Sequence, residues 1–234
     1  MSKIEVSKLV DVFRRSSLGG YIDVIKFDAL DYVLVDAVSR GRTVGVYSIF
    51  SKSYFPLDRT FSVSSVAVIK VMRTLFRNVK MVEFSVDDDV IISGSGTVYR
   101  IRQRTDVPKQ NDVKPNISLG MMPDYGYQIV GEYSIPIDVL STIKPDEDSV
   151  RFIGTQEGLK LKFSYLGGDT VKTYRGQTNE SYDIFIDYRE LSRILDSLDG
   201  EVVFRVLKDK YYRLQVAQYT EDYVLNYLLV ETSG

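Results

Sequence analysis

Most of the chain alternates between apolar and polar residues with a period of two, which is the pattern of β-strands with one buried face. The segment YIDVIKFDALDYVLVDAVSRGRTVGVYSIF, residues 21–50, is rich in Val, Ile and Tyr and predicts three strands joined by tight turns. Residues 80–104, 149–176 and 200–230 have the same pattern. The sequence therefore predicts antiparallel sheets whose strands follow one another along the chain.

Four short stretches take the helical period instead, because their apolar residues lie three and four positions apart. These stretches are residues 6–17, 65–78, 137–144 and 188–198. Ser64 precedes the second stretch and Asp187 precedes the fourth, and both are residue types that cap the N-termini of helices.

The order strand, helix, several strands, helix, three strands occurs twice, which indicates an internal repeat. Val68 and Met72 of the second helix have the same spacing as Leu191 and Leu195 of the fourth. The stretch between the copies is rich in proline and reads as a connection between domains. We therefore predict an N-terminal domain of residues 1–104, a linker of residues 105–126 and a C-terminal domain of residues 127–234.

Composition narrows the classes of function. The chain has no Cys and no His, so Ser-His-Asp and Cys-His catalysis and thiolate- or His-ligated metal sites are excluded. It contains no apolar run of the roughly 20 residues that span a bilayer, and its first residues lack a signal-peptide pattern. We expect an intracellular protein with a binding or structural role and no cofactor or bound metal.

One predicted helix has a purely basic polar face. Residues 64–82, SSVAVIKVMRTLFRNVKMV, contain no acid although the whole chain has a net charge of -2. On a helical wheel the four cations of this stretch fall in one quadrant, opposite the apolar residues. In the other three helices, Asp or Glu residues lie close to the cations. The cations that the four helices are predicted to present away from their sheets are Lys8, Arg14, Arg15, Lys70, Arg73, Arg77, Lys80, Lys144, Arg189 and Arg193.

Four such helices on one side of their sheets would form a positively biased wall suited to a phosphate backbone. The alternative is a solvated helix face that happens to lack acids. The run Asp87–Asp89 is interpreted as a turn rather than a metal site, because its counterpart in the second copy is Lys208–Lys210.

The duplicated pattern resembles the sliding DNA clamps, in particular the two-domain clamps of archaea, eukaryotes and T4-like phages. The resembling segments are YVLVDAVSRGRTVGVY (32–47), SIPIDVLSTI (134–143) and YVLNYLLVETSG (223–234). In the last segment Leu229 and Val230 stand where the family often has Ala-Pro. The resemblance implies an α+β protein with the DNA-clamp fold, in which two repeated domains of antiparallel β-sheet each carry two helices on one face.

The resemblance also implies a function without enzymatic activity. A PCNA-like processivity factor would form a toroid, by default a homotrimer, that encircles duplex DNA without reading its sequence. It would tether a DNA polymerase, a clamp loader and other replication and repair proteins. The expected edges of ring closure are Thr97–Arg104 and Thr170–Arg175. The expected location is nucleoid-associated, in the host cytoplasm for a viral protein and nuclear for a eukaryotic one.

Clamp partners dock a short peptide into an apolar groove between the linker, a first-domain loop and the C-terminal tail. The matching positions are Val44, Val46, Ile117, Leu119, Met121, Met122, Tyr227, Leu229 and Val230. Methionines suit a surface that accepts several ligands. The alternative is that these residues only cover a sheet edge.

Three other functions stay open. A monomeric clamp-like factor could sit on DNA with its basic face and never close. A carboxylate-metal nuclease would need several converging acids, and the sequence indicates no such set. A β-rich structural or virion protein would need only the duplicated architecture.

Overall fold

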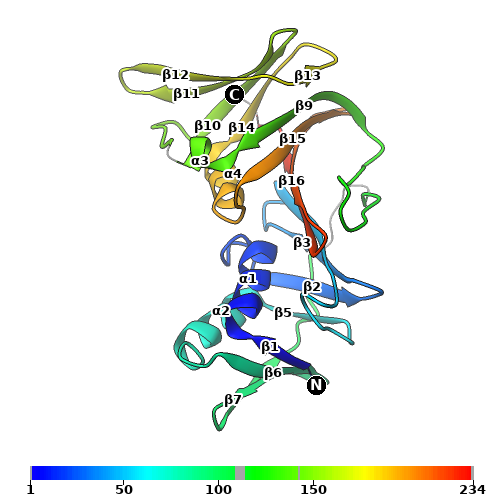
Figure 1. Ribbon diagram of the computed structural model, residues 1–234. Coiled ribbons are helices and arrows are strands. Elements are labelled where there is room, and N and C mark those ends of the chain that lie inside the picture. Colours follow the sequence, from blue (N-terminus) through cyan, green and yellow to red (C-terminus); the bar gives the residue numbers. More distant parts are fainter. Residues whose placement is uncertain (1, 109–113, 142, 233–234) are drawn as a thin grey trace. The chain divides into compact units, whose positions relative to one another are not determined.

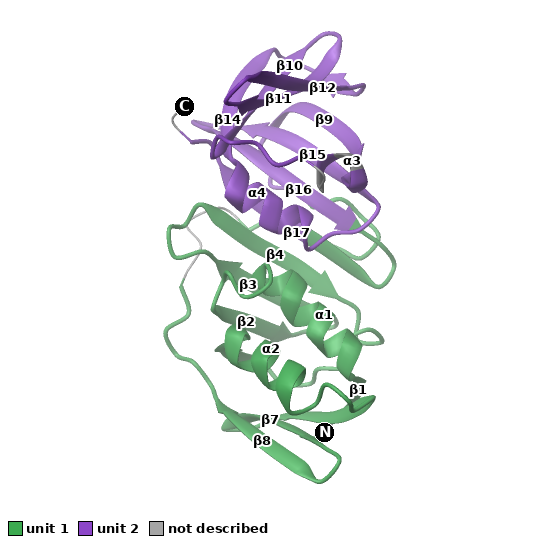
Figure 2. Ribbon diagram, turned by 90° about the vertical axis from the view of Figure 1, so that its left-hand side faces the viewer, with its two compact units in different colours: residues 1–123, 219–225 green, residues 124–218, 226–234 purple. Residues whose placement is uncertain are grey.

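The computed structural model describes residues 2–108, 114–141 and 143–232 (Figure 1). The chain divides into two compact units (Figure 2). Unit 1 comprises residues 1–123 and 219–225, and unit 2 comprises residues 124–218 and 226–234. Most of the predicted linker is therefore counted with unit 1, as is a short segment from near the C-terminus.

Unit 1 contains two helices and eight complete strands among its described residues. They are β1 (Ser2–Glu5), α1 (Val6–Ser17), β2 (Val24–Ala29), β3 (Val33–Val38), β4 (Val44–Phe50), β5 (Phe61–Ser64), α2 (Ser65–Thr74), β6 (Met81–Val86), β7 (Asp89–Gly94) and β8 (Thr97–Arg102). The strands form two antiparallel arrangements, β1-β6-β7-β8 and β5-β2-β3-β4. Strand β8 lies at the edge of the first.

Helices α1 and α2 lie side by side (Figure 2), with α1 against β2, β3 and β4 and α2 against β5 and β8. The buried face of α1 includes Leu9, Val12 and Phe13, which follow the helical spacing. Phe13 lies 5.1 Å from Phe27 between ring centroids, and Phe27 stacks on Phe61 at 4.8 Å. The apolar stripe of each helix thus faces the sheet, which leaves the polar stripe toward solvent.

Unit 2 repeats the element order of unit 1 with one short extra strand. Its elements are β9 (Gln128–Pro136), α3 (Ile137–Ser141), β10 (Ser149–Thr155), β11 (Gly158–Tyr165), β12 (Gly168–Tyr174), β13 (Gln177–Thr178), β14 (Tyr182–Asp187), α4 (Tyr188–Leu195), β15 (Glu201–Lys208), β16 (Tyr212–Tyr219) and β17 (Tyr223–Val230). The end of β16 and the first three residues of β17 are counted with unit 1. Strand β12 lies at the edge of the arrangement β12-β11-β10-β14.

The predicted α+β architecture of antiparallel sheets and four helices is confirmed, but three helices are shorter than predicted. Helix α2 ends at Thr74, where the side-chain hydroxyl bonds back to the carbonyl of Lys70 at 2.8 Å. Phe76 then turns into the core and is fully buried. The second basic helix therefore stops before Arg77, and two of its four predicted cations lie outside it.

Candidate DNA interface and peptide-binding patch

Two of the helices that carry the candidate DNA-facing cations begin at a residue whose side chain caps the N-terminus. Ser64 Oγ accepts a hydrogen bond from the amide of Ala67 at 3.3 Å, so it caps α2. The carboxylate of Asp187 accepts from the amides of Arg189 and Glu190 at 2.8 and 3.3 Å, so it caps α4. Both predicted N-caps are confirmed, and they fix where each basic stripe begins.

The four predicted cations of the second basic stretch are exposed but do not share one helix face. Lys70 and Arg73 lie on the exposed side of α2, whereas Arg77 lies in the turn that follows. Lys80 precedes β6, and its carbonyl accepts from the amide of Val6 at 3.0 Å. None of the four forms an ion pair with another described residue. The prediction of one helical quadrant is therefore wrong, since the helix ends early, but the charges remain exposed.

Arg15 on α1 does not have the solvent-facing position that the helical wheel predicted. Its relative exposure is 7%, and its Nε donates to the carboxylate of Asp11 at 2.7 Å. Arg14 donates to the same carboxylate at 3.1 Å, and the hydroxyl of Tyr54 does so at 3.0 Å. The guanidinium of Arg15 also lies 5.2 Å from the ring centroid of Tyr223. Arg15 is therefore a buried cation that holds α1 in place, and we no longer count it among the candidate DNA-facing cations.

Asp11, Arg14, Arg15 and Tyr54 form a group that we call the Asp11 cluster. The pKa of Asp11 and the pKa of Tyr54 shift in opposite directions in this cluster. Burial raises the pKa of Asp11, but the hydrogen bonds from Arg15, Arg14 and Tyr54 together with the charge of Arg15 outweigh it, so the pKa is lowered overall. Burial raises the pKa of Tyr54, and the neighbouring Asp11 charge raises it further. At neutral pH Asp11 is thus charged and Tyr54 is a neutral donor. The remaining α1 cations, Lys8 and Arg14, are half-exposed.

The cations of unit 2 are fewer and partly paired. Arg189 on α4 is exposed, and it forms ion pairs with Asp187 at 3.2 Å and with Asp148 at 3.4 Å. Arg193 lies on the exposed side of the same helix, and Lys144 is exposed beyond the end of α3. The basic bias is therefore stronger on α2 than on either helix of unit 2, as the sequence indicated.

An apolar patch on unit 1 lies under the second part of the linker. Leu34, Tyr47, Ile49 and Val224 are buried, and the partly buried Tyr32, Ile117 and Leu119 pack against them. The Nζ of Lys114 lies 3.1 Å from the carboxylate of Asp36 and 5.6 Å from the centroid of the Tyr47 ring. These contacts hold residues 114–119 against the outer side of β3 and β4. We call this group the linker patch.

The prediction of the peptide groove was wrong for four of its strand residues. Val44, Val46, Tyr227 and Leu229 are almost completely buried, at 0–1% exposure. Side chains alternate along a strand, so Val44 and Val46 point away from the face that carries Tyr47 and Ile49. Of the linker residues predicted for the groove, Ile117 and Leu119 join the patch. Met121 is 63% exposed, Met122 and Val230 are half-buried, and none of these three belongs to the patch.

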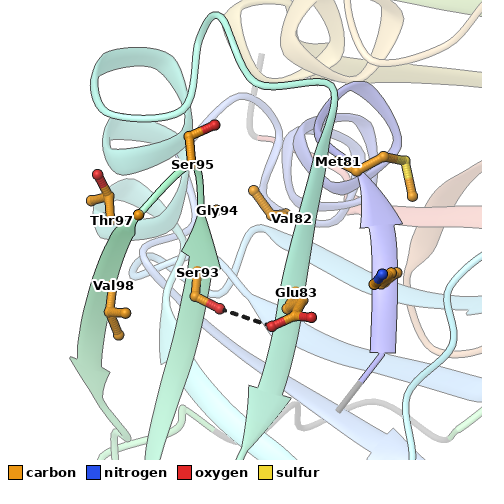
Figure 3. A pocket seen from close by; sticks show the side chains of 10 residues that line it. Met81, Val82, Glu83, Ser93, Gly94, Ser95, Thr97 and Val98 are labelled. Carbon is orange, nitrogen blue, oxygen red and sulfur yellow. Dashed lines mark hydrogen bonds between the residues drawn. The ribbon is translucent and has the colours of Figure 1, made fainter.

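The two expected ring edges are sheet edges in the structure. Strand β8 pairs with β7, and strand β12 pairs with β11. A hollow of about 500 Å³ lies beside the start of β8, and its lining includes Met81, Glu83, Ser93 and Val98 (Figure 3). Ser93 donates to the carboxylate of Glu83 at 3.5 Å across the floor of this hollow.

The described residues contain neither a cluster of metal-ligating side chains nor a helix that could span a membrane. No group of three or more His, Cys, Asp or Glu side chains among them is placed to hold a metal ion. No described helix is long and apolar enough to cross a membrane.

Two units with the same order of strands and helices, each with its helices packed on sheet, define the fold of a sliding DNA clamp. Among solved structures, the chain is similar to the proliferating cellular nuclear antigen of Entamoeba histolytica, with a TM-score of 0.72 and 15% identity over 99% of this chain and 98% of that one. It is also similar to a PCNA2–PCNA3 complex from Sulfolobus tokodaii, with a TM-score of 0.69 and 13% identity over 98% of each chain. No family model and no curated protein matches the sequence.

Proposed function

We propose that this chain is a subunit of a sliding clamp, a DNA polymerase processivity factor that encircles duplex DNA. The observation that carries the proposal is the likeness to clamps over nearly the whole of both chains, and the exposed cations Lys70 and Arg73 on α2 support it. The chain would have no catalytic activity, and its contribution would be to keep polymerase and other replication and repair proteins on DNA.

The distribution of cations supports sliding rather than fixed binding. Lys70, Arg73 and Arg77 are exposed and have no ionic partner among the described residues, whereas Lys8 and Arg14 are only half-exposed. Such dispersed cations attract phosphates without reading bases. Because each contact is weak, exchange from one phosphate to the next has a small barrier. A net charge of -2 on the whole chain also disfavours DNA binding on other faces.

Ring closure would use the two sheet edges. A strand at a sheet edge has a row of unpaired backbone donors and acceptors, and another strand can satisfy them. The edge strand β8 of one subunit would pair with an edge such as β12 of the next. Three two-domain chains would supply the six domains of the ring, with the homotrimer as the default.

The linker patch would receive partner peptides. Its partly exposed members Tyr32, Ile117 and Leu119 offer apolar contact at the surface of a buried cluster. A partner peptide with apolar anchors could extend this cluster without rearranging the sheet. The DNA polymerase and the clamp loader are the proposed partners for this site.

The mass in solution tests the ring. Sedimentation equilibrium should give three times the chain mass of 26.7 kDa in the trimer. A chain that stays monomeric at all concentrations and salt strengths, while still stimulating polymerase, would favour the monomeric alternative. Lack of any DNA binding or stimulation would leave only the structural alternative.

A further inference from the structure

The two units carry opposite charge on their helices. We call the two helices of a unit, with the connections that lead from them to the next strands, its helix layer; α1 lies against α2 in unit 1, and α3 lies against α4 in unit 2 (Figure 2). The helix layer of unit 1, residues 6–23 and 65–80, contains seven Lys or Arg and two Asp. The helix layer of unit 2, residues 137–148 and 188–200, contains three Lys or Arg and seven Asp or Glu.

The exposed cations of the unit 1 layer have no acid competing for them. Lys70 and Arg73 lie on the exposed side of α2, and neither forms an ion pair with another described residue. Of the two acids in this layer, Asp11 already binds the guanidinium of Arg15 at 2.7 Å. The other, Asp23, accepts a hydrogen bond from the side chain that caps α2. The positive charge of α2 is therefore available to a phosphate backbone.

The cations of the unit 2 layer lie among carboxylates. Arg189 forms ion pairs with Asp187 at 3.2 Å and with Asp148 at 3.4 Å. Asp196 and Asp199 are exposed at the other end of α4. A phosphate that approaches Arg189 meets the field of these acids, and it gains little from a guanidinium that already has two carboxylate partners.

Two acids of the unit 2 layer have no cation to neutralise them. Asp146 and Glu147 lie in the connection from α3 to β10, both are exposed, and neither forms an ion pair with another described residue. The carboxylate of Asp146 accepts from the amide of Leu166 at 2.9 Å, which fixes its position. Two uncompensated carboxylates close to Lys144 along the chain outweigh the attraction of that single lysine for phosphate.

We propose that duplex DNA is held by the helix layer of unit 1 alone, and that the acids of the unit 2 layer keep phosphates away from Arg189 and Arg193. The inference rests on the sliding clamp proposed above and specifies which of its two domains makes the phosphate contacts. A clamp that binds DNA through one domain of each chain has fewer contacts to exchange as it slides.

Two double variants of the full chain compare the layers. Arg189→Gln/Arg193→Gln removes two cations from unit 2, and Lys70→Gln/Arg73→Gln removes two from unit 1. Fluorescence anisotropy with duplex DNA at several salt concentrations should give the wild-type salt slope for the first variant and a slope lower by about two for the second. An equal fall in both variants, or no fall in the second, would overturn the inference.

A third variant tests the acids. Asp146→Asn/Glu147→Gln removes two negative charges and keeps an acceptor for the amide of Leu166. It should bind duplex DNA about threefold more tightly at low salt, and the gain should disappear at about 0.5 M salt, because screening removes the repulsion. The matched control Asp58→Asn/Asp88→Asn removes two exposed acids from unit 1 outside its helix layer and should leave the affinity unchanged.

Two results of this comparison would contradict the role of the acids. The first is an equal gain in the third variant and its control, which would reflect the net charge of the chain alone. The second is no gain in the third variant. None of these outcomes decides the clamp function, which depends on retention of the wild-type chain on closed circular DNA and is measured separately.

Discussion

Arg15 and Asp11 form an ion pair within α1, with Nε of the arginine 2.7 Å from the carboxylate one turn earlier. The arginine side chain is 8% exposed and the aspartate side chain is 22% exposed. Tyr54, from the loop after β4, donates to the same carboxylate at 3.0 Å. A residue pair that looks like part of a basic surface stripe therefore joins α1 to the loop after β4.

Replacement of Asp11 by Asn should destabilise the fold. The change leaves the buried guanidinium of Arg15 without its charged partner, and we expect a loss of about 2 kcal/mol in the free energy of unfolding. Urea denaturation followed by circular dichroism measures it. Asp58→Asn, an exposed change outside the cluster, should have little effect. An equal effect of the two substitutions would contradict the role of the cluster.

The Asp11 cluster also predicts a pH dependence. The pKa of Asp11 is lowered from its usual 3.8, so the folded state binds this proton less readily than the unfolded state. Its contribution to stability is thus present above the usual pKa and is lost as pH falls through the lowered one. The difference in stability between the wild type and Asp11→Asn should be constant from neutral pH to about pH 5 and should shrink below pH 4. A difference that grows as pH falls would refute this assignment.

Neutralising the two exposed cations of α2 should weaken DNA binding. For Lys70→Gln/Arg73→Gln we expect the slope of log affinity against log salt to fall by about two, because each phosphate contact releases roughly one counterion. Fluorescence anisotropy with duplex DNA at several salt concentrations measures the slope. The matched double variant Lys3→Gln/Lys210→Gln should keep the wild-type slope. Equal slopes in all three proteins would show that α2 does not face DNA.

Arg15→Gln separates structural from DNA-facing cations. We expect it to lower the free energy of unfolding, because it removes the partner of Asp11, and to leave the salt slope of the folded protein unchanged. Lys70→Gln should leave the free energy of unfolding unchanged and should lower the salt slope. A fall in the salt slope for Arg15→Gln, without loss of stability, would return this residue to the DNA-facing set.

The linker patch predicts separate effects for two apolar positions on opposite faces of the sheet. Leu119→Ser removes a partly exposed contact, so capture of the polymerase from the same source should fall by about tenfold with little loss of stability. Val46→Ala should instead cost about 2 kcal/mol in the free energy of unfolding, because Val46 is fully buried, and should leave capture by the folded protein unchanged. Surface plasmon resonance and thermal unfolding measure the two effects. Loss of capture in Val46→Ala would contradict the assignment of faces.

The features that local rules control could be predicted from the sequence. Ser64 and Asp187 cap α2 and α4 as predicted, because capping depends on one side chain and the next three amides. The alternation of strand residues and the repeated element order also predicted the antiparallel sheets, whereas the expectation of β8 and β12 at their edges came from the resemblance to sliding clamps.

Other features depend on contacts that no local pattern contains. A helical wheel placed Arg15 outside, but the loop that brings Tyr54 over α1 buries it. The groove prediction took Val46 from the match to the clamp family, and the period of two could not correct it, because it gives two faces and does not say which one the linker covers. The position of Lys114 beside Asp36 and Tyr47 settles that choice in the structure.

The most direct test of the central claim is retention of the chain on closed DNA. The chain is mixed at low salt with linear plasmid, onto whose ends a closed ring can thread, and the plasmid is then circularised with DNA ligase. The circles are washed in about 0.5 M NaCl, which screens phosphate contacts but does not release a closed ring. The clamp proposal predicts that protein stays on the circular plasmid and is released when a restriction enzyme cuts it. Equal retention before and after cutting, or complete release from the uncut circle, would contradict it.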